Sequence, residues 1–263
     1  MGSDSERFFE DSHANRIKYR TLFISDLHLG TKGCQAERFL DFFNKHAFEN
    51  IYIVGDFIDI WMLKKTVHWP QSHTDIIRKI LKRSKHSKIY LLIGNHDEFG
   101  KHFLGHFANI EICERLTHIT ADNKRILILH GHQFDYIIIN AKWIAYLGSL
   151  AYNLIISMNL FVDKIRRMFG FHRHWSLSSY IKKRVKNAAS FIFSFEDTVS
   201  KYAKKGGFDG VLAGHIHTPC IKNINGIEYY NSGDWVESCS ALVEDCNGKI
   251  HMINGWQNEH LNK

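Results

Sequence analysis

The sequence predicts an α/β protein built in layers, and two patterns along the chain indicate it. The first is an alternation of apolar runs of strand length with segments of helical spacing, which is typical of a layered α/β domain. The second is that several apolar runs end in Asp, His or Asn side chains. Because polar side chains at strand ends can converge at one edge of a sheet, this pattern also predicts a functional site.

The predicted elements lie on both sides of a long central segment. Strands are predicted at 20–25, 51–55, 88–93 and 125–129, and helices near 35–47 and 72–84. After residue 207, four short strand-like runs separated by Gly and Asn turns predict a second sheet: GVLAG, IEYYNS, CSALVE and KIHMIN. We therefore expect a core of residues 20–134 and 207–255, interrupted by a largely helical insertion at 135–206.

The insertion contains the most apolar stretch of the chain, twenty residues without a charge at 143–162. Its length would allow a membrane span. However, its apolar residues recur at three- and four-residue spacing, which indicates an amphipathic helix, and no second stretch could return the chain across a membrane. We expect the insertion to lie over the site, with its apolar face either packed in a helical hairpin or offered to lipid.

The positive charge of the chain is concentrated directly after this stretch. The formal net charge is +7, and residues 164–195 contain eight Lys or Arg and no Asp or Glu, so the rest of the chain is nearly neutral. A basic surface of this kind fits an anionic membrane, a nucleic acid or a phosphorylated substrate. A solvated basic helix with no ligand is the alternative.

Composition narrows the class of protein. A chain of 263 residues with 44% hydrophobic residues can form one large globular domain. Its first twenty residues are polar and lack the apolar stretch of a secretory signal. The five cysteines are scattered without a C-x-x-C pair, which argues against a disulfide framework and a structural zinc module. We expect a cytoplasmic protein that can bind the inner face of the membrane.

The residues at the strand ends are of the types that hold metal ions and transfer protons. Carboxylate and imidazole ligands together favour manganese, iron or zinc, whereas calcium takes oxygen alone. Two such ions about 3.5–4 Å apart need a bridging carboxylate and can clamp a phosphoryl group. Asp56, central in the order of the motifs, is the natural bridge. The candidate residues are Asp26, His28, Asp56, Asp59, Asn95, His96, Asp97, His130, His132, His215 and His217.

The ordered fragments that carry these residues resemble the calcineurin-like metallophosphoesterase superfamily. They are D-L-H at 26–28, G-D-x-x-D at 55–59, G-N-H-D at 94–97, H-G-H at 130–132 and G-H-I-H at 214–217. The resemblance implies a four-layer α/β/β/α sandwich with two divalent metal ions, Mn²⁺ first, with Fe or Zn as alternatives. It also implies two ligand sets that share Asp56. One set is Asp26, His28, Asp56 and His217, and the other is Asp56, Asn95, His130 and His215.

The resemblance also implies a mechanism and roles for the remaining residues. A metal-bridging hydroxide attacks phosphorus in line with the leaving oxygen, and Asn95 helps to stabilise the developing charge. His96 protonates the leaving group or steadies the transition state, and Asp97 either orients that imidazole or caps a loop. Asp59 is expected to hold a ligand histidine. His132 is either a site residue or a structural histidine.

Within the superfamily, the chain most resembles the UDP-2,3-diacylglucosamine pyrophosphatases of lipid A synthesis and their relatives. The helical insertion and the closing NSGDWVESCSALVE at 231–244 carry this likeness, although those pyrophosphatases have arginine where this chain has His96. The resemblance implies a phosphorylated, lipid-bearing substrate at an anionic membrane surface. A soluble phosphodiesterase or nuclease is the second hypothesis, although nucleic acid is not the expected partner. An inactive membrane-binding scaffold is the third hypothesis and ranks last, because no ligand is missing.

Overall fold

The computed structural model of the protein describes residues 16–107, 109–136, 138, 191–192 and 194–255. The chain divides into two compact units, residues 1–132 with 200–263 and residues 133–199. The first unit contains both sheets and all the candidate site residues. The apolar stretch 143–162 and the eight basic residues after it lie outside the described residues, so the interpretation of the insertion stays a prediction.

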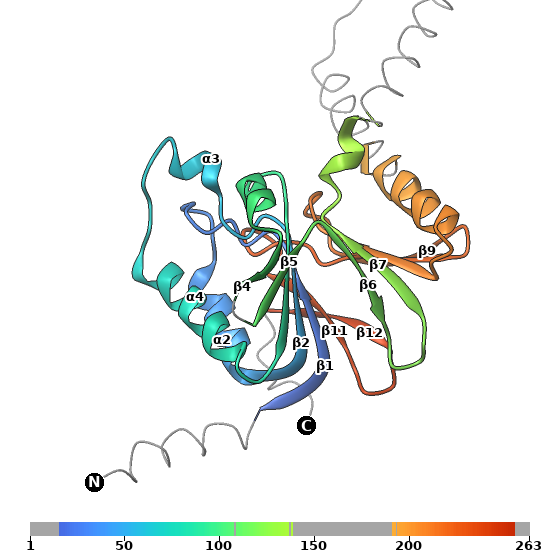
Figure 1. The fold of residues 1–263 in the computed structure, drawn as a ribbon, viewed down its shortest axis with the longest axis horizontal. Coiled ribbons are helices and arrows are strands. Elements are labelled where there is room, and N and C mark those ends of the chain that lie inside the picture. The colour runs from blue at the N-terminus through green and yellow to red at the C-terminus, as the bar shows by residue number, and fades with distance from the viewer. Residues whose placement is uncertain (1–15, 108, 137, 139–190, 193, 256–263) are drawn as a thin grey trace, which may run out of the picture. The chain divides into compact units, whose positions relative to one another are not determined.

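In the part of the chain that the structure describes, twelve strands form two mixed sheets (Figure 1). The larger sheet has the order β12-β11-β1-β2-β3-β5-β4. Its strands are β1 Ile17–Ile24, β2 His46–Val54, β3 Lys88–Leu92, β4 Gly105–Phe107, β5 Ile110–Cys113, β11 Ser240–Glu244 and β12 Ile250–Asn254. The strands β1, β2, β3 and β5 run parallel, whereas β4, β11 and β12 pair antiparallel.

The smaller sheet has the order β6-β7-β8-β10-β9. Its strands are β6 Arg115–Ile119, β7 Arg125–Leu129, β8 Gly210–Ala213, β9 Cys220–Ile224 and β10 Ile227–Asn231. The central strands β7, β8 and β10 are parallel, with antiparallel β6 and β9 at the edges. Parallel strands end at the same edge of a sheet, so the loops that follow them are brought together.

The helices are short and connect the strands. They are α2 Ala36–Lys45, α3 Ile60–Leu63 and α4 Gln71–Arg83, with the 3₁₀ helices η1 Glu98–Phe103 and η2 His132–Phe134. Residues 194–205 are also helical and precede β8. No helix in the described part of the chain is both long enough and apolar enough to cross a membrane.

Alternation along the central strands gives the larger sheet two apolar faces. Leu22 and Ile24 of β1 pack in a cluster with Phe39 and Phe43 of α2, so α2 and α4 cover the outer face. Phe23, from the same strand, faces the other way into a second cluster. That cluster joins the two sheets through Phe23, Tyr52, Val54, Leu92, Leu242, Ile126, Ile128 and Leu212.

The outer face of the smaller sheet is covered by the end of the helix before β8. Ala203 is fully buried, and the Tyr202 hydroxyl accepts a 2.7 Å hydrogen bond from Arg115 of β6. The layers are therefore helix, sheet, sheet and helix, and the predicted α/β class with its four-layer sandwich is confirmed. The sequence analysis missed β4, β5, β6 and β9, which mix polar with apolar residues over only three to five positions.

Candidate metal centre

The candidate site lies where the parallel strands of both sheets end. Asp26 follows β1, Asp56 follows β2 and Asn95 follows β3, while His130 follows β7 and His215 follows β8. The loops are tied together by backbone hydrogen bonds, since the Asp26 amide donates to the Gly55 carbonyl at 3.1 Å and Gly214 donates to His130 at 3.1 Å. Segments separated by nearly 200 positions thus meet at one place, as the pattern of strand ends predicts.

Five of the predicted metal ligands have left-handed backbone conformations. The φ angles are 54° for Asp26, 51° for His28, 51° for Asp56, 68° for His215 and 52° for His217. A residue with a Cβ atom rarely adopts this region, and such strain persists where the surrounding structure enforces it. The conformation turns each side chain abruptly out of the strand direction, which explains how neighbouring loops can aim several ligands at one point.

Two glycines leave the room that the side chains need. A Cβ atom at Gly94 would stand 2.1 Å from Asp56 Oδ1, and one at Gly55 would stand 2.3 Å from His130 Nδ1. Both approaches are far shorter than any real Cβ contact, so a larger residue would displace the carboxylate or the imidazole. These clashes explain why glycine stands at the first position of the G-D and G-N fragments.

The first group of ligand atoms comes from Asp26, His28 and His217. Their ligand atoms lie within 4.8 Å of one another. His217 Nε2 is 3.1 Å from Asp26 Oδ1, and His28 Nε2 is 3.8 Å from the same oxygen. Asp26 is fully buried and His28 nearly so, whereas the His217 side chain is 39% exposed. The group therefore opens toward solvent on the His217 side.

The second group comes from Asp26, Asp56 and His130. The His130 Nδ1 atom is 2.8 Å from the Val54 carbonyl, which sets Nδ1 as the donor and leaves Nε2 free to face a ligand. That Nε2 atom lies 3.4 Å from Asp56 Oδ2 and 3.2 Å from Asn95 Oδ1. A further set of three, His28, Asp56 and His96, overlaps these two groups. None of the sets includes His215, but its ring centroid is 5.2 Å from that of His130.

A single oxygen of Asp56 faces both groups. Asp56 Oδ2 lies 3.4 Å from His130 Nε2 and 3.8 Å from His28 Nε2, while Oδ1 accepts a 2.9 Å hydrogen bond from the His96 amide. The carboxylate is thus held by the backbone on one side and open to two imidazoles on the other. A bridging ligand between two cations needs this arrangement.

The buried polar atoms here fit divalent metal ions better than they fit one another. Asp26 Oδ1 and His28 Nε2 are buried and have no hydrogen-bond partner, although each has an oppositely polarised atom within 4 Å. Leaving such atoms unsatisfied is costly unless a ligand completes them. Carboxylate oxygen with imidazole nitrogen suits manganese, iron or zinc.

Mutual interactions shift the pKa values of these groups. Burial raises the pKa of Asp56 and of Asp26, but the neighbouring imidazoles outweigh it and hold both below their usual range. Burial lowers the pKa of His130, but the carboxylates of Asp56 and Asp26 outweigh it and raise that pKa to about 9. The centre therefore holds ionised carboxylates, the protonation state that a cation requires.

Asp59 holds two imidazoles at once. Its Oδ2 atom is 3.1 Å from His28 Nδ1 and 3.0 Å from His96 Nδ1, while its Oδ1 atom accepts a 2.8 Å hydrogen bond from the Met62 amide. A carboxylate behind a ligand histidine orients the ring and its tautomer. Sequence reasoning missed Trp61, whose ring centroid is 4.4 Å from that of His96. The sequence gives no sign that this tryptophan is exposed and lies beside His96, and only the structure shows it.

The contacts of Asp97 fit the second of its two predicted roles, the capping of a loop. Its Oδ1 atom accepts a 2.6 Å hydrogen bond from the Gly94 amide, and its Oδ2 atom accepts a 2.9 Å bond from the Phe57 amide. Burial, followed by the nearby Asp56 charge, raises its pKa to about 6. The carboxylate therefore caps the loop of the G-N-H-D fragment, and the group that contacts the His96 imidazole is Asp59.

Two further residues lie beside the metal groups. The His132 ring is 5.5 Å from the His130 ring, and burial next to that imidazole lowers its pKa to about 4. Asp234 Oδ2 lies 4.0 Å from His217 Nδ1, on the side of the ring away from Asp26. Sequence reasoning gave Asp234 no role, although it follows the turn N-S-G within the closing fragment.

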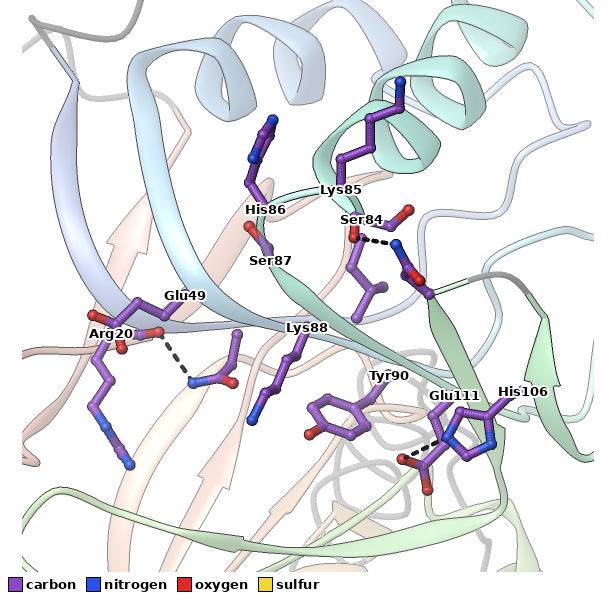
Figure 2. A pocket seen from close by; sticks show the side chains of 13 residues that line it. Arg20, Glu49, Ser84, Lys85, His86, Ser87, Lys88, Tyr90, His106 and Glu111 are labelled. Carbon is purple, nitrogen blue, oxygen red and sulfur yellow. Dashed lines mark hydrogen bonds and ion pairs between the residues drawn. The ribbon is translucent and has the colours of Figure 1, made fainter.

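A pocket of about 870 Å³ is lined by none of the candidate residues. Figure 2 shows that it is lined by polar side chains such as Arg20, Glu49 and Lys88. Arg20 lies within β1, Glu49 lies within β2 and Lys88 begins β3, whereas the candidate residues follow the ends of the strands. The volume of a pocket therefore does not identify the candidate metal centre of this protein.

Comparison with known proteins agrees with this geometry. A family model described as calcineurin-like phosphoesterase matches residues 19–219. The UDP-2,3-diacylglucosamine hydrolase of Psychromonas ingrahamii is 28% identical over 252 residues, covering 89% of this chain and 96% of that protein. The enzyme of the same name from Coxiella burnetii (strain RSA 331 / Henzerling II) is 28% identical, covering 78% of this chain and 84% of that protein.

Two solved structures have a similar chain trace at low identity. An archaeal phosphodiesterase is 14% identical with a TM-score of 0.41, covering 89% of this chain and 98% of that chain. The E. coli phosphoesterase Yfce is 15% identical with a TM-score of 0.41, covering 89% of this chain and 97% of that chain. Since the family model spans well over half of the sequence and ends just beyond His217, the chain belongs to the calcineurin-like phosphoesterase family.

Proposed function

We propose that the protein is a phosphoric ester or pyrophosphate hydrolase that uses two divalent metal ions. Asp26, His28 and His217 would hold one ion, and Asn95, His130 and His215 the other, with Asp56 shared. Manganese is the expected metal, with iron or zinc as alternatives. Bound ions of this kind polarise phosphoryl oxygens and lower the pKa of water, so that hydrolysis proceeds near neutral pH.

The observation that carries this proposal is the position of Asp56 Oδ2 between His28 Nε2 at 3.8 Å and His130 Nε2 at 3.4 Å. Neither distance is a good hydrogen bond, and both imidazoles have a second contact that fixes the other nitrogen, at Asp59 and at the Val54 carbonyl. Two orientated nitrogens that face one carboxylate oxygen fit two cations that share it.

The residues around the two groups would bind and orient the phosphoryl group. The Asn95 side chain, next to His130, would contact a phosphoryl oxygen. The His96 imidazole would hold a proton at the leaving oxygen, because its ring is partly exposed, with a 24% accessible side chain. Asp59 and Trp61 would keep that ring in place, and Asp97 would keep the backbone of its loop in place.

For the substrate, we propose UDP-2,3-diacylglucosamine or a related phospho-amphiphile. The named relatives support this over most of their length and most of this chain. The uncharged stretch 143–162 and the basic residues after it also support an amphiphile and an anionic membrane surface, on the cytoplasmic side. The structure describes neither segment, so this part of the proposal depends on sequence and likeness.

The test is a comparison of substrates with manganese supplied. UDP-2,3-diacylglucosamine, bis(p-nitrophenyl) phosphate, p-nitrophenyl phosphate and single-stranded DNA should be incubated with the full chain. We expect hydrolysis of the generic diester and a much larger kcat/KM for the diacylated nucleotide sugar. Cleavage of DNA in preference to it would favour the nuclease hypothesis. Manganese binding without hydrolysis of any of the four would overturn the proposed activity.

A further inference from the structure

An apolar pocket lies on the outer face of the larger sheet, between α4 and η1. Its volume is about 340 Å³, within the range of small-molecule sites. Its lining side chains are aliphatic or aromatic, including Leu81 of α4 and Ile93 after β3, and Asp97 is the one charged residue among them. A pocket with no hydrogen-bond donors along its walls selects hydrocarbon.

The segment that forms its rim exposes large apolar side chains. Phe99 is 50% exposed, Phe103 60% and Phe107 65%, and all three line the pocket. Leu104, between them, is 51% exposed. Scattered exposed apolar residues are ordinary, but four within nine positions form a continuous patch of the kind that contacts an apolar ligand.

The pocket shares its wall with the candidate metal centre. Phe57 follows the bridging residue Asp56, and Asp97 follows His96, and both Phe57 and Asp97 line the pocket. The Asp97 carboxylate binds the Phe57 amide at 2.9 Å and the Gly94 amide at 2.6 Å. The loop that carries Asn95 and His96 therefore separates the polar centre on one side from the apolar pocket on the other.

The charges around the rim argue for one molecule rather than for an anionic membrane. Lys101 is paired with Glu98 at 3.0 Å and lies 3.9 Å from Glu114, and His106 lies 4.0 Å from Glu111. Three carboxylates and one lysine thus stand near the rim, and two of the carboxylates lie within 4 Å of that lysine, so the rim does not attract an anionic lipid surface. A single hydrocarbon chain needs no charge on the rim.

We propose that this pocket binds one alkyl or acyl chain of a phospho-amphiphile whose phosphoryl group occupies the metal centre, an inference that depends on the proposed function for its head group. The chain would leave the centre over the loop at 94–97 and enter past Phe99 and Phe103. The pocket would then select substrates by chain length, because its limited volume sets how many methylenes it can bury.

The experiment is a binding series with the manganese-loaded full chain. The probes are butyl-, hexyl-, octyl- and decylphosphonate, which carry the head group but cannot be hydrolysed, and calorimetry measures their affinity. Burying a methylene is worth about 0.8 kcal/mol, so the affinity should rise about fourfold per added methylene until the pocket is full.

Two changes test the location. Leu81→Trp fills the pocket from α4, and Phe103→Ala with Phe107→Ala removes the rim. Since Leu81 and both phenylalanines are at least 40% exposed, the fold should tolerate these changes. Both variants should lose most of the chain-length dependence and still hydrolyse bis(p-nitrophenyl) phosphate as the wild type does. The matched controls are Ile221→Trp and Ile119→Ala, at side chains of the smaller sheet that are each 45% exposed.

The outcomes separate this inference from the proposed function. A chain-length dependence that both variants retain would overturn the inference while leaving hydrolysis intact. So would a loss of binding to phosphatidylglycerol vesicles without any change in phosphonate affinity, which would make the rim a membrane contact. If the protein hydrolysed no phosphoester but the dependence disappeared in both variants, the pocket would stand and the proposed activity would fail.

Discussion

Asp56 Oδ2 lies 3.4 Å from His130 Nε2, and the opposite nitrogen of that imidazole is 2.8 Å from the Val54 carbonyl. The carbonyl comes from the end of β2, two residues before Asp56, so one strand positions both partners. The other nitrogen, Nε2, is thereby directed at the carboxylate oxygen that also faces His28. The relationship is why we assign Asp56 to both cation sites.

Replacing Asp56 by Asn tests that assignment. Asn keeps the size of the side chain and the oxygen that accepts from the His96 amide, but it removes the charge that two cations would share. We expect kcat/KM for bis(p-nitrophenyl) phosphate to fall by more than about 100-fold. The loss of a residue that only supports a metal ligand already costs up to about 100-fold, and Asp56 would be a ligand itself. Metal content by mass spectrometry should fall with it. Asp75→Asn, at a 44% exposed carboxylate of α4, is the control.

Asp59→Asn should weaken metal binding without abolishing it. Asp59 contacts His28 and His96 through one oxygen and caps α3 through the other, so the variant keeps the cap but loses the charged acceptor. We expect the manganese Kd to rise about 10- to 100-fold. Titration of the metal-free protein measures it. An unchanged Kd would mean that Asp59 serves only the helix end.

His96→Ala should reduce turnover more than metal content, because its partly exposed ring is suited to the leaving group. We expect a loss of about 100-fold in kcat, within the usual range for a general acid. A poor leaving group, such as a simple alkyl ester, should suffer more than p-nitrophenolate, which needs no proton. Equal losses of metal and turnover would instead place His96 among the ligands, next to His28 and Asp56.

Trp61→Ala should imitate part of the His96 defect. The indole lies 4.4 Å from the His96 ring but contacts no predicted metal ligand of the first group, so metal content should not change. We expect a smaller fall in kcat, which Trp61→Phe should largely restore because it returns an aromatic face. Failure of Phe to restore kcat would show that the indole does not act by packing on His96.

Glu244 of β11 is not a candidate site residue, and its pKa predicts how the stability of the folded protein depends on pH. Burial raises its pKa, but hydrogen bonds from His118, Thr21 and the Ala121 amide outweigh it and lower that pKa from 4.5 to about 2. Because the unfolded chain then binds the proton more readily, this stabilisation is present above about pH 4.5 and is lost as the pH falls toward 2.

Urea unfolding of Glu244→Gln at pH 6 and pH 3 checks this. The variant should be less stable than the wild type by about 3 kcal/mol at pH 6, since a buried charge network loses its central anion, and the gap should narrow at pH 3. Glu37→Gln, at an exposed position of α2, should show neither effect. A gap that stayed constant with pH would mean that Glu244 keeps its ordinary pKa.

The central strands and the helices α2 and α4 could be predicted because their apolar residues recur at regular spacing. The strand predicted at 125–129 coincides with β7, and the helices near 35–47 and 72–84 correspond to α2 and α4 within two residues. β4, β5, β6 and β9 could not be predicted, since none of these short segments contains a long apolar run. Strands of three to five residues depend on tertiary contacts more than on propensity.

For the site, the sequence could supply the residue types but not their mutual geometry. The order of Asp, Asn and His at strand ends predicts that they meet. It does not predict that Asp59 contacts both His28 and His96, or that Asp97 caps the loop between them. Those contacts depend on left-handed backbone angles and on the space beside Gly94, which no periodicity encodes.

The most direct test of the shared carboxylate is a crystal structure of the manganese-soaked protein with anomalous scattering recorded at the manganese edge. We expect two anomalous peaks about 3.5–4 Å apart, one beside His28 and His217 and the other beside His130, with Asp56 Oδ2 between them. A single peak that Asp56 does not contact, or none at saturating manganese, would contradict it.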